Sequence, residues 1–274
     1  MASSASASPP GPPHDYAKLA PASTDSRDQT LVIRELIPGM LTFSVPFARF
    51  NTVPIGGRST AISLGDKGIF VYVSHPLTAA TKEALSLLGG DVKWLVTPDG
   101  EHGINIKSWA EAFPSAQPIG VSRFKDEKPD VNWAGLFGAG GQDKKYGFEP
   151  EITLHQVAAH RNDELMALHH PSGTLLQADM LFNMPPNEQY SRAGLPLWFR
   201  LLGSGSWMAP GSMVHERLIN GVVADNDLMK KELVPIFAAK FDRIVPCHGD
   251  VIDAGGRAAW DKVWGKYKTD VVAP

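Results

Sequence analysis

Two carboxylates and an imidazole follow one apolar run near the middle of the chain. The run at residues 94–96 ends at Pro98, and Asp99, Glu101 and His102 occupy the positions just beyond it. Apolar residues then recur at helical spacing, so the sequence predicts a strand, a polar loop and a helix. Reactive groups gather at the carboxyl ends of strands in α/β proteins. This loop is therefore a candidate for one edge of a functional site.

Three further side chains that can bind a metal also lie just past a predicted strand. They are His160 after the strand 152–157, Asp179 after the strand 174–177, and His248 after the strand 243–245. Together with His102 they supply three imidazoles and one carboxylate, which suit Zn²⁺, Fe²⁺ or Mn²⁺. Each residue alone is more simply read as a surface or capping residue. The prediction of a metal site depends on all four strand ends lying on one side of the fold.

The elements that must position these residues alternate in a pattern typical of layered α/β proteins. Strands are expected at 31–33, 40–45, 59–64, 68–73, 93–96, 117–121, 152–157, 164–169, 174–177 and 243–245, and helices at 78–88, 225–240 and 258–267. Thr78 is the expected N-cap of the first of these helices, and Pro235 is expected to kink the second. A strand-rich series followed by helices occurs twice, without an internal sequence repeat.

Three segments interrupt this pattern. Residues 1–28 are rich in small residues and proline, and we expect a disordered leader there, a linker being the alternative. Residues 123–150 are expected to form a surface excursion. Residues 183–222 mix aromatic residues and methionine with glycine and proline, which fits an irregular cap on the core or the wall of a substrate pocket. Residues 29–274 are expected to form a single domain.

Composition limits the classes of function. The chain has 274 residues, 43% of them hydrophobic, and a formal net charge of −3, so binding to nucleic acid through phosphate neutralisation is not indicated. The single cysteine, Cys247, rules out an intrachain disulfide and fits a reducing compartment. No apolar run reaches the length of a membrane span. We expect a cytoplasmic protein that acts on a small molecule, without nucleic-acid or membrane partners, and the aromatic cap allows a homodimer.

The later motifs resemble those of the metallo-β-lactamase fold superfamily, over a range from about Leu31 to Tyr267. The matching stretches are Ala159-His160, Ala178-Asp179 and Cys247-His248-Gly249. The resemblance implies a four-layer αββα sandwich. The H-x-H-x-D-H motif of the superfamily is degenerate in this chain, as it would be in a divergent branch. Its four ligand positions hold Pro98, Gly100, His102 and Gly103.

This loss of ligands changes the expected metal count. A standard site of this superfamily has about six protein ligands around two metals, whereas this chain offers about four. We therefore predict one divalent metal, zinc first with iron or manganese as alternatives, bound by His102, His160, Asp179 and His248. Asp99 is the predicted catalytic residue, which would orient or deprotonate the attacking water.

The resemblance implies a metal-dependent hydrolase that acts on an ester, a lactone or a thioester. Four protein ligands would complete a tetrahedral zinc site, however, and closed zinc sites are structural. Two alternatives therefore stay open. One is a non-catalytic protein of this fold that binds a small ligand or a partner through the cap, and the other is an iron-dependent redox enzyme. Among the remaining histidines, His75 is a candidate for a supporting contact, whereas His155 and His215 are expected at the surface.

Overall fold

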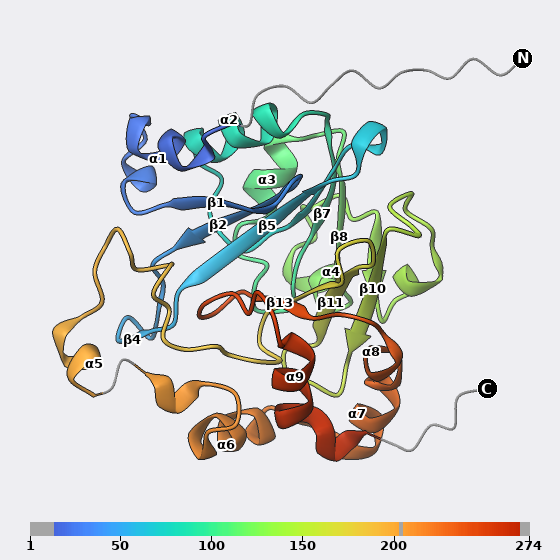
Figure 1. The fold of residues 1–274 in the computed structure, drawn as a ribbon. Coiled ribbons are helices and arrows are strands. Elements are labelled where there is room, and N and C mark those ends of the chain that lie inside the picture. The colour runs from blue at the N-terminus through green and yellow to red at the C-terminus, as the bar shows by residue number, and fades with distance from the viewer. Residues whose placement is uncertain (1–13, 203–204, 269–274) are drawn as a thin grey trace, which may run out of the picture.

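Two β-sheets pack face to face between two outer layers of helices (Figure 1). The computed structural model describes residues 14–202 and 205–268. The helices α1, α2 and α3 cover the outer face of the first sheet, and α7, α8 and α9 cover the second. This arrangement confirms the αββα sandwich that the sequence predicted.

The first sheet has seven strands in the order β1-β2-β5-β6-β7-β8-β9. Their bounds are β1 Val32–Ile37, β2 Met40–Val45, β5 Gly57–Ser63, β6 Ile69–Tyr72, β7 Val92–Val96, β8 Gln117–Val121 and β9 Gly135–Phe137. The strands from β1 to β6 form the expected antiparallel meander, and those from β6 to β9 are parallel. Strand β9 lies inside the predicted surface excursion, so that prediction was wrong for these residues. The strand is too short and glycine-rich for its sequence to stand out.

The second sheet has the order β10-β11-β12-β13. Its strands are β10 Ile152–Val157, β11 Glu164–His169, β12 Thr174–Gln177 and β13 Arg243–Pro246. Strand β11 is antiparallel to both β10 and β12, whereas β12 and β13 are parallel. Strands β10, β12 and β13 therefore run in one direction and end at the same edge. The segments that carry His160, Asp179 and His248 leave the sheet at that edge.

The helices agree with the sequence signals at 78–88, 225–240 and 258–267, whereas those at 19–22, 124–127, 197–201 and 213–221 were not predicted. The α-helices are α1 Leu19–Ala22, α2 Ala79–Leu88, α3 Ile106–Ala112, α4 Phe124–Glu127, α5 Leu197–Leu201, α6 Met213–Gly221, α7 Asn226–Glu232, α8 Val234–Ala238 and α9 Gly256–Trp264. Thr78 caps α2 by accepting a hydrogen bond from the backbone N–H of Thr81 at 3.3 Å. Pro235 divides the predicted helix into α7 and α8. In the part of the chain that the structure describes, no helix is long and apolar enough to span a bilayer.

The remaining short elements connect these layers. A two-stranded hairpin is formed by β3 Ala48–Arg49 and β4 Val53–Pro54, and the 3-10 helices are η1 Tyr16–Lys18, η2 Ser26–Gln29, η3 Gly65–Lys67, η4 Gly141–Asp143, η5 Ser206–Met208 and η6 Gly265–Tyr267. The hairpin lies in the loop that leads from β2 to β5. It overhangs the edge of the sandwich where the candidate ligands emerge.

Side chains alternate between the two faces of each strand, which divides the core into three layers. Val71 packs toward the outer helices of the first sheet, whereas its neighbour Tyr72 packs between the sheets. Residues from both sheets meet in the middle layer: Phe70, Tyr72 and Trp94 from the first sheet, and Leu165, Leu176 and Val245 from the second. The third layer packs β11 and β12 against α8 and α9. The middle layer thus holds the two sheets together.

The predicted disordered leader extends too far along the chain. Residues 1–13 lie outside the described residues, but residues 14–28 contain η1, α1 and most of η2. Tyr16 and Ala20 are buried in the outer core of the first sheet. Asp28 is fully buried and accepts hydrogen bonds from the hydroxyl of Ser23 at 2.6 Å and the backbone N–H of Ala80 at 3.0 Å. The contact with Ala80, 52 residues along the chain, is invisible in the local composition of the segment.

Candidate metal centre

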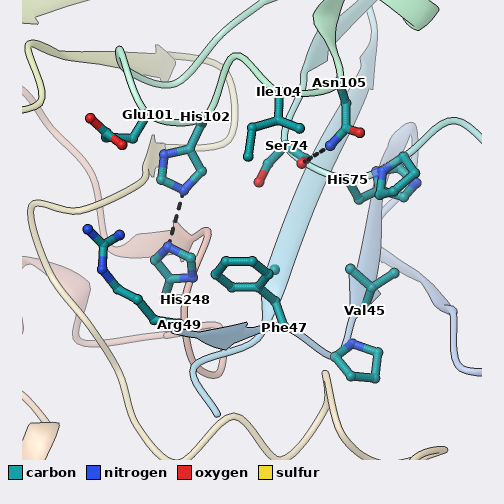
Figure 2. Close-up of a pocket in the computed structure, with 13 residues that line it drawn as sticks. Val45, Phe47, Arg49, Ser74, His75, Glu101, His102, Ile104, Asn105 and His248 are labelled. Carbon is teal, nitrogen blue, oxygen red and sulfur yellow. Dashed lines mark hydrogen bonds between the residues drawn. The ribbon is translucent and has the colours of Figure 1, made fainter. Parts of the chain in front are cut away.

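Three of the four predicted ligands meet at one edge of the sandwich. A ring nitrogen of His102, a carboxylate oxygen of Asp179 and a ring nitrogen of His248 all lie within 4.8 Å of one another. The Nε2 atoms of His102 and His248 are 3.1 Å apart, and His248 Nε2 is 3.3 Å from Asp179 Oδ1. Figure 2 shows the two imidazoles pointing toward each other. We call these three residues the metal cluster.

Strand pairing explains why these residues converge. Gln177 of β12 lies opposite Pro246 of β13 in parallel register. Asp179 and His248 each follow two residues later, so they leave the sheet at the same level. His102 comes from the loop after β7 in the other sheet. The metal cluster therefore bridges the open end between the two sheets.

The Nδ1 atom of each imidazole in the cluster, which points away from the shared position, lies within hydrogen-bond distance of an acceptor. His248 Nδ1 lies 2.6 Å from the carbonyl oxygen of Gly56, and His102 Nδ1 lies 2.8 Å from Asp99 Oδ1. A carbonyl or a carboxylate can only accept, so each ring donates from Nδ1. In the neutral ring the lone pair is then on Nε2. Two lone pairs face each other at 3.1 Å, close to a carboxylate, and this arrangement requires a shared cation. The donor set therefore fits a divalent metal.

Electrostatics within the cluster agree with this arrangement. Burial disfavours a charge on His102, but the carboxylates of Asp99, Asp179 and Glu164 outweigh it and raise its pKa to about 10. Burial also disfavours the charge of Asp179, but the surrounding imidazoles of His248, His102 and His160 hold the pKa of Asp179 below its usual range. Without a metal, a proton on His102 would occupy the shared position. A metal must displace that proton to bind.

Two residues that the sequence did not single out hold Asp179 in place. Asn162 Nδ2 donates to Asp179 Oδ2 at 2.6 Å. The fully buried carboxyl group of Glu164 accepts from the backbone N–H groups of Ala178 at 2.5 Å and Asp179 at 3.1 Å. Burial and the charges of Asp99 and Asp179 raise the pKa of Glu164 well above its ordinary value. A glutamate that begins an otherwise apolar strand is the one sequence signal that would have found Glu164.

His160 lies outside the metal cluster. Its ring is buried, and its Nδ1 accepts a hydrogen bond from the backbone N–H of Asn162 at 3.2 Å. A neutral ring that accepts at Nδ1 carries its proton on Nε2. His160 Nε2 has no hydrogen-bond partner within residues 14–202 and 205–268. Coordination by His160 stays a prediction, and its contacts favour a hydrogen-bond donor over a ligand.

Asp99 is completely buried behind His102. Its Oδ1 accepts from the backbone N–H groups of Glu101 at 2.7 Å and His102 at 2.8 Å, as well as from His102 Nδ1. A carboxylate on the outer nitrogen of a metal-binding histidine orients the ring and makes it a better ligand. The contacts of Asp99 thus favour a positioning role, and the catalytic role predicted from the sequence is not tested by them. Glu101 is turned toward Arg123, 3.3 Å away.

The three histidines set aside from the sequence differ in their surroundings. His75 is buried between the hydroxyls of Ser59 at 2.7 Å and Thr81 at 2.9 Å, and burial lowers its pKa to about 3. His155 is half-buried. The surface prediction for His215 was wrong, because α6 buries it and its Nε2 accepts from the backbone N–H of Phe182 at 3.1 Å.

Phe182 connects this buried histidine to the metal cluster. The ring of Phe182 stacks on His248, with centroids 5.4 Å apart and planes inclined by 8°. Phe47 flanks the same imidazole at 6.1 Å. His248 is therefore clamped by two aromatic rings and by the Gly56 carbonyl. This packing fixes the direction in which its Nε2 lone pair points.

Two cavities open beside the metal cluster. His102 and His248 line one of about 360 Å³, which we call the histidine-side cavity (Figure 2). Asp179 lines another of about 370 Å³, which we call the aspartate-side cavity. Three protein donors leave a tetrahedral metal one open position, as in catalytic zinc sites. A small molecule in either cavity would lie beside the metal cluster.

Comparisons with known proteins agree with the fold. No protein-family model matches the chain, and no curated protein does. A metallo-β-lactamase from Erythrobacter litoralis superposes with a TM-score of 0.56 at 11% identity, over 87% of this chain and 96% of that one. A metallo-β-lactamase from Pontibacter korlensis superposes with a TM-score of 0.55 at 12% sequence identity, over 86% of this chain and 98% of that one.

A different chemistry appears among the similar structures. A metal-soaked flavodiiron core from Synechocystis superposes with a TM-score of 0.57 at 12% identity, over 86% of this chain and 60% of that one. The chain has the metallo-β-lactamase fold. At such low sequence identity the likeness shows a shared fold alone. Together with the three-residue cluster, this fold supports binding of a divalent metal.

Proposed function

We propose that this protein is a hydrolase that uses one divalent metal, with zinc as the first candidate, to cleave an ester, a lactone or a thioester of a small molecule. The opposed Nε2 lone pairs of His102 and His248 beside Asp179 carry the proposal. When bound, the metal would polarise the substrate carbonyl and lower the pKa of a water molecule to about 7. The two flanking cavities supply the space for the substrate.

The residues around the cluster have separate tasks in this proposal. His102, Asp179 and His248 hold the metal. Asp99 keeps the Nδ1 proton on His102, which leaves the Nε2 lone pair free for coordination. The cytoplasmic location proposed for the protein agrees with its single, buried cysteine.

A second candidate is an iron-dependent redox enzyme. Two histidines and one carboxylate with open positions are the ligand set of many non-haem Fe(II) enzymes. The likeness to a flavodiiron core adds to this candidate. Metal identity separates the two candidates, since the redox enzyme requires iron and consumes an oxidant, whereas the hydrolase works with zinc.

The test combines metal content with turnover. Wild type and the variants His102→Ala, Asp179→Ala and His248→Ala are purified in parallel and examined by elemental analysis, with exposed His170→Ala as the matched control. We expect about one metal per chain in wild type and His170→Ala, and a large loss in the other three. Metal-loaded wild type is then assayed on an ester, a lactone and a thioester. Retained metal without turnover of any of them would favour a non-catalytic binding protein.

A further inference from the structure

One arginine lies between the two cavities. Arg49 lines both the histidine-side and the aspartate-side cavity, and among the described residues it is the one residue that the two walls share. It comes from β3 of the hairpin that overhangs the metal cluster. Figure 2 shows its side chain running beside His248. Arg49 therefore lies where the walls of the two cavities meet.

The hairpin holds Arg49 in a defined place. Phe50 and Asn51 form its turn with φ values of 53° and 56°, which non-glycine residues rarely adopt. The guanidinium of Arg49 lies 5.2 Å from the centroid of the Phe50 ring, a cation–π contact. The base of the hairpin is tied down by backbone hydrogen bonds from Ile55 and Gly56 to the carbonyl of Phe47. Gly56 also holds the ring of His248, so the hairpin and the cluster are anchored together.

Arg49 is exposed, and no described residue forms an ion pair with it. Within residues 14–202 and 205–268, no carboxylate lies within ion-pair distance of its guanidinium. Glu101, the acidic residue on the wall of the histidine-side cavity, is paired with Arg123. Asp179 on the other wall is bound to His248 and Asn162. The guanidinium of Arg49, where the walls of the two cavities meet, is thus available to an anionic group of the substrate.

The aspartate-side cavity is suited to an apolar group. Its wall includes Phe50, Ile55, Phe182, Trp207, Met208 and Leu218. Apolar walls with a few placed polar groups are typical of small-molecule sites. The planar guanidinium fork matches the two oxygens of a carboxylate. No lysine lines either cavity in the described part of the chain.

We propose that the substrate is an ester, lactone or thioester that carries a carboxylate, bound by Arg49, and an apolar arm, bound in the aspartate-side cavity. This inference rests on the proposed hydrolase function for the reaction itself. Hydrolysis forms a C–O bond between water and the acyl carbon and breaks the acyl C–O or C–S bond. A water proton passes to the leaving alkoxide or thiolate. The other water proton is released to solvent, and the acyl carbon becomes a second carboxylate, so the products carry one more negative charge than the substrate.

Binding can be tested without turnover. Decanoate and decanol share an apolar chain and differ in the carboxylate, and neither has a bond to cleave. Their affinities are measured by calorimetry on metal-free protein, so that no metal can hold the carboxylate. The variants are Arg49→Met, Arg49→Lys and a control, Arg200→Met, at an exposed arginine that lines neither cavity.

Wild type is expected to bind decanoate at least tenfold more tightly than decanol. Arg49→Met should remove that preference and leave decanol binding unchanged, Arg49→Lys should retain part of it, and Arg200→Met should match wild type. Equal binding of both probes by wild type would overturn the proposal, as would an unchanged preference in Arg49→Met. These outcomes are independent of catalysis. Failure to hydrolyse any ester would count against the hydrolase function and leave the Arg49 result standing.

Discussion

His102 and His248 face each other through their Nε2 atoms at 3.1 Å, and an acceptor holds the Nδ1 of each ring. The acceptors are unequal, because Asp99 is a carboxylate and Gly56 contributes a neutral carbonyl. The Asp99 carboxylate therefore favours the protonated form of His102, and the raised pKa of His102 agrees with this. The two facing Nε2 atoms share one position for a cation, which a proton or a divalent metal can occupy. This relationship is the basis of the first two predictions.

Asp99→Asn tests whether Asp99 positions His102. The amide keeps the shape of the side chain but removes the charge that supports the Nδ1–H of His102. We expect a loss of metal affinity of about 10- to 100-fold, as for other supporting carboxylates, measured by competition with a chromophoric chelator. Asp66→Asn, in the distant η3, is the control. Unchanged metal affinity with a large fall in kcat would instead assign Asp99 to the chemical step.

His160→Ala distinguishes three ligands from four. The hydrogen bond from Asn162 to Nδ1 indicates that His160 Nε2 carries a proton. We therefore expect the variant to retain about one metal per chain, because the three donors of the cluster remain, and to lose catalytic rate. Elemental analysis after dialysis, beside His248→Ala, gives the answer. Loss of metal in both variants would restore His160 as a fourth ligand.

Arg58 is a buried cation that ties the loop of His248 to the first sheet. Its Nη1 donates to the carbonyls of Pro246 and Gly249 at 2.7 Å each, and its Nε donates to Ser44 at 2.9 Å. Its side chain is fully buried and lies 3.4 Å from Glu188. Arg58→Met should lower the free energy of unfolding by about 3–5 kcal/mol, because two buried carbonyls lose their donor and Glu188 keeps only Arg34 and Ser44 as partners.

Urea denaturation of Arg58→Met measures this loss. Lys82→Met, at an exposed position of α2, should change stability by less than about 0.5 kcal/mol. The metal affinity of refolded Arg58→Met should also fall, because the turn that carries His248 loses two anchors. A variant as stable as wild type would show that Glu188 and the carbonyls find other partners.

The buried histidine His75 makes the fold sensitive to acid. Burial lowers its folded pKa to about 3, whereas the unfolded side chain has a pKa of about 6.5. The unfolded state therefore binds a proton first, so the stabilisation is complete above pH 6.5 and is lost as the pH falls toward 3. The expected slope is about 1.4 kcal/mol per pH unit for this histidine.

Urea denaturation of wild type and His75→Gln between pH 7 and pH 4.5 checks this prediction. Glutamine can keep hydrogen bonds to Ser59 and Thr81 but does not titrate. The variant should be less stable at pH 7 and should lose less stability on acidification than wild type. Parallel curves for the two proteins would contradict the assignment of the acid sensitivity to His75.

Local patterns predicted the elements of the fold well. The strands at 152–157, 164–169 and 174–177 were placed at their observed bounds, because apolar runs bounded by turns carry a strong signal. Segments whose order depends on distant partners were missed. Strand β9 gains its partners from β8, and residues 14–28 are fixed by contacts with β1 and α2. Such contacts leave no mark on local composition.

For the site, the sequence by itself determined which side chains leave the strand ends and so which residues can meet. Asp179 and His248 lie side by side because β12 and β13 pair in parallel, with Gln177 opposite Pro246. Only the tertiary structure decided which ring nitrogens face the cluster. That choice depends on the carbonyl of Gly56 for His248 and on the backbone of Asn162 for His160. The physical reason is that the proton on an imidazole follows its hydrogen-bond partner, and the partner of His248 is 192 residues away in the chain.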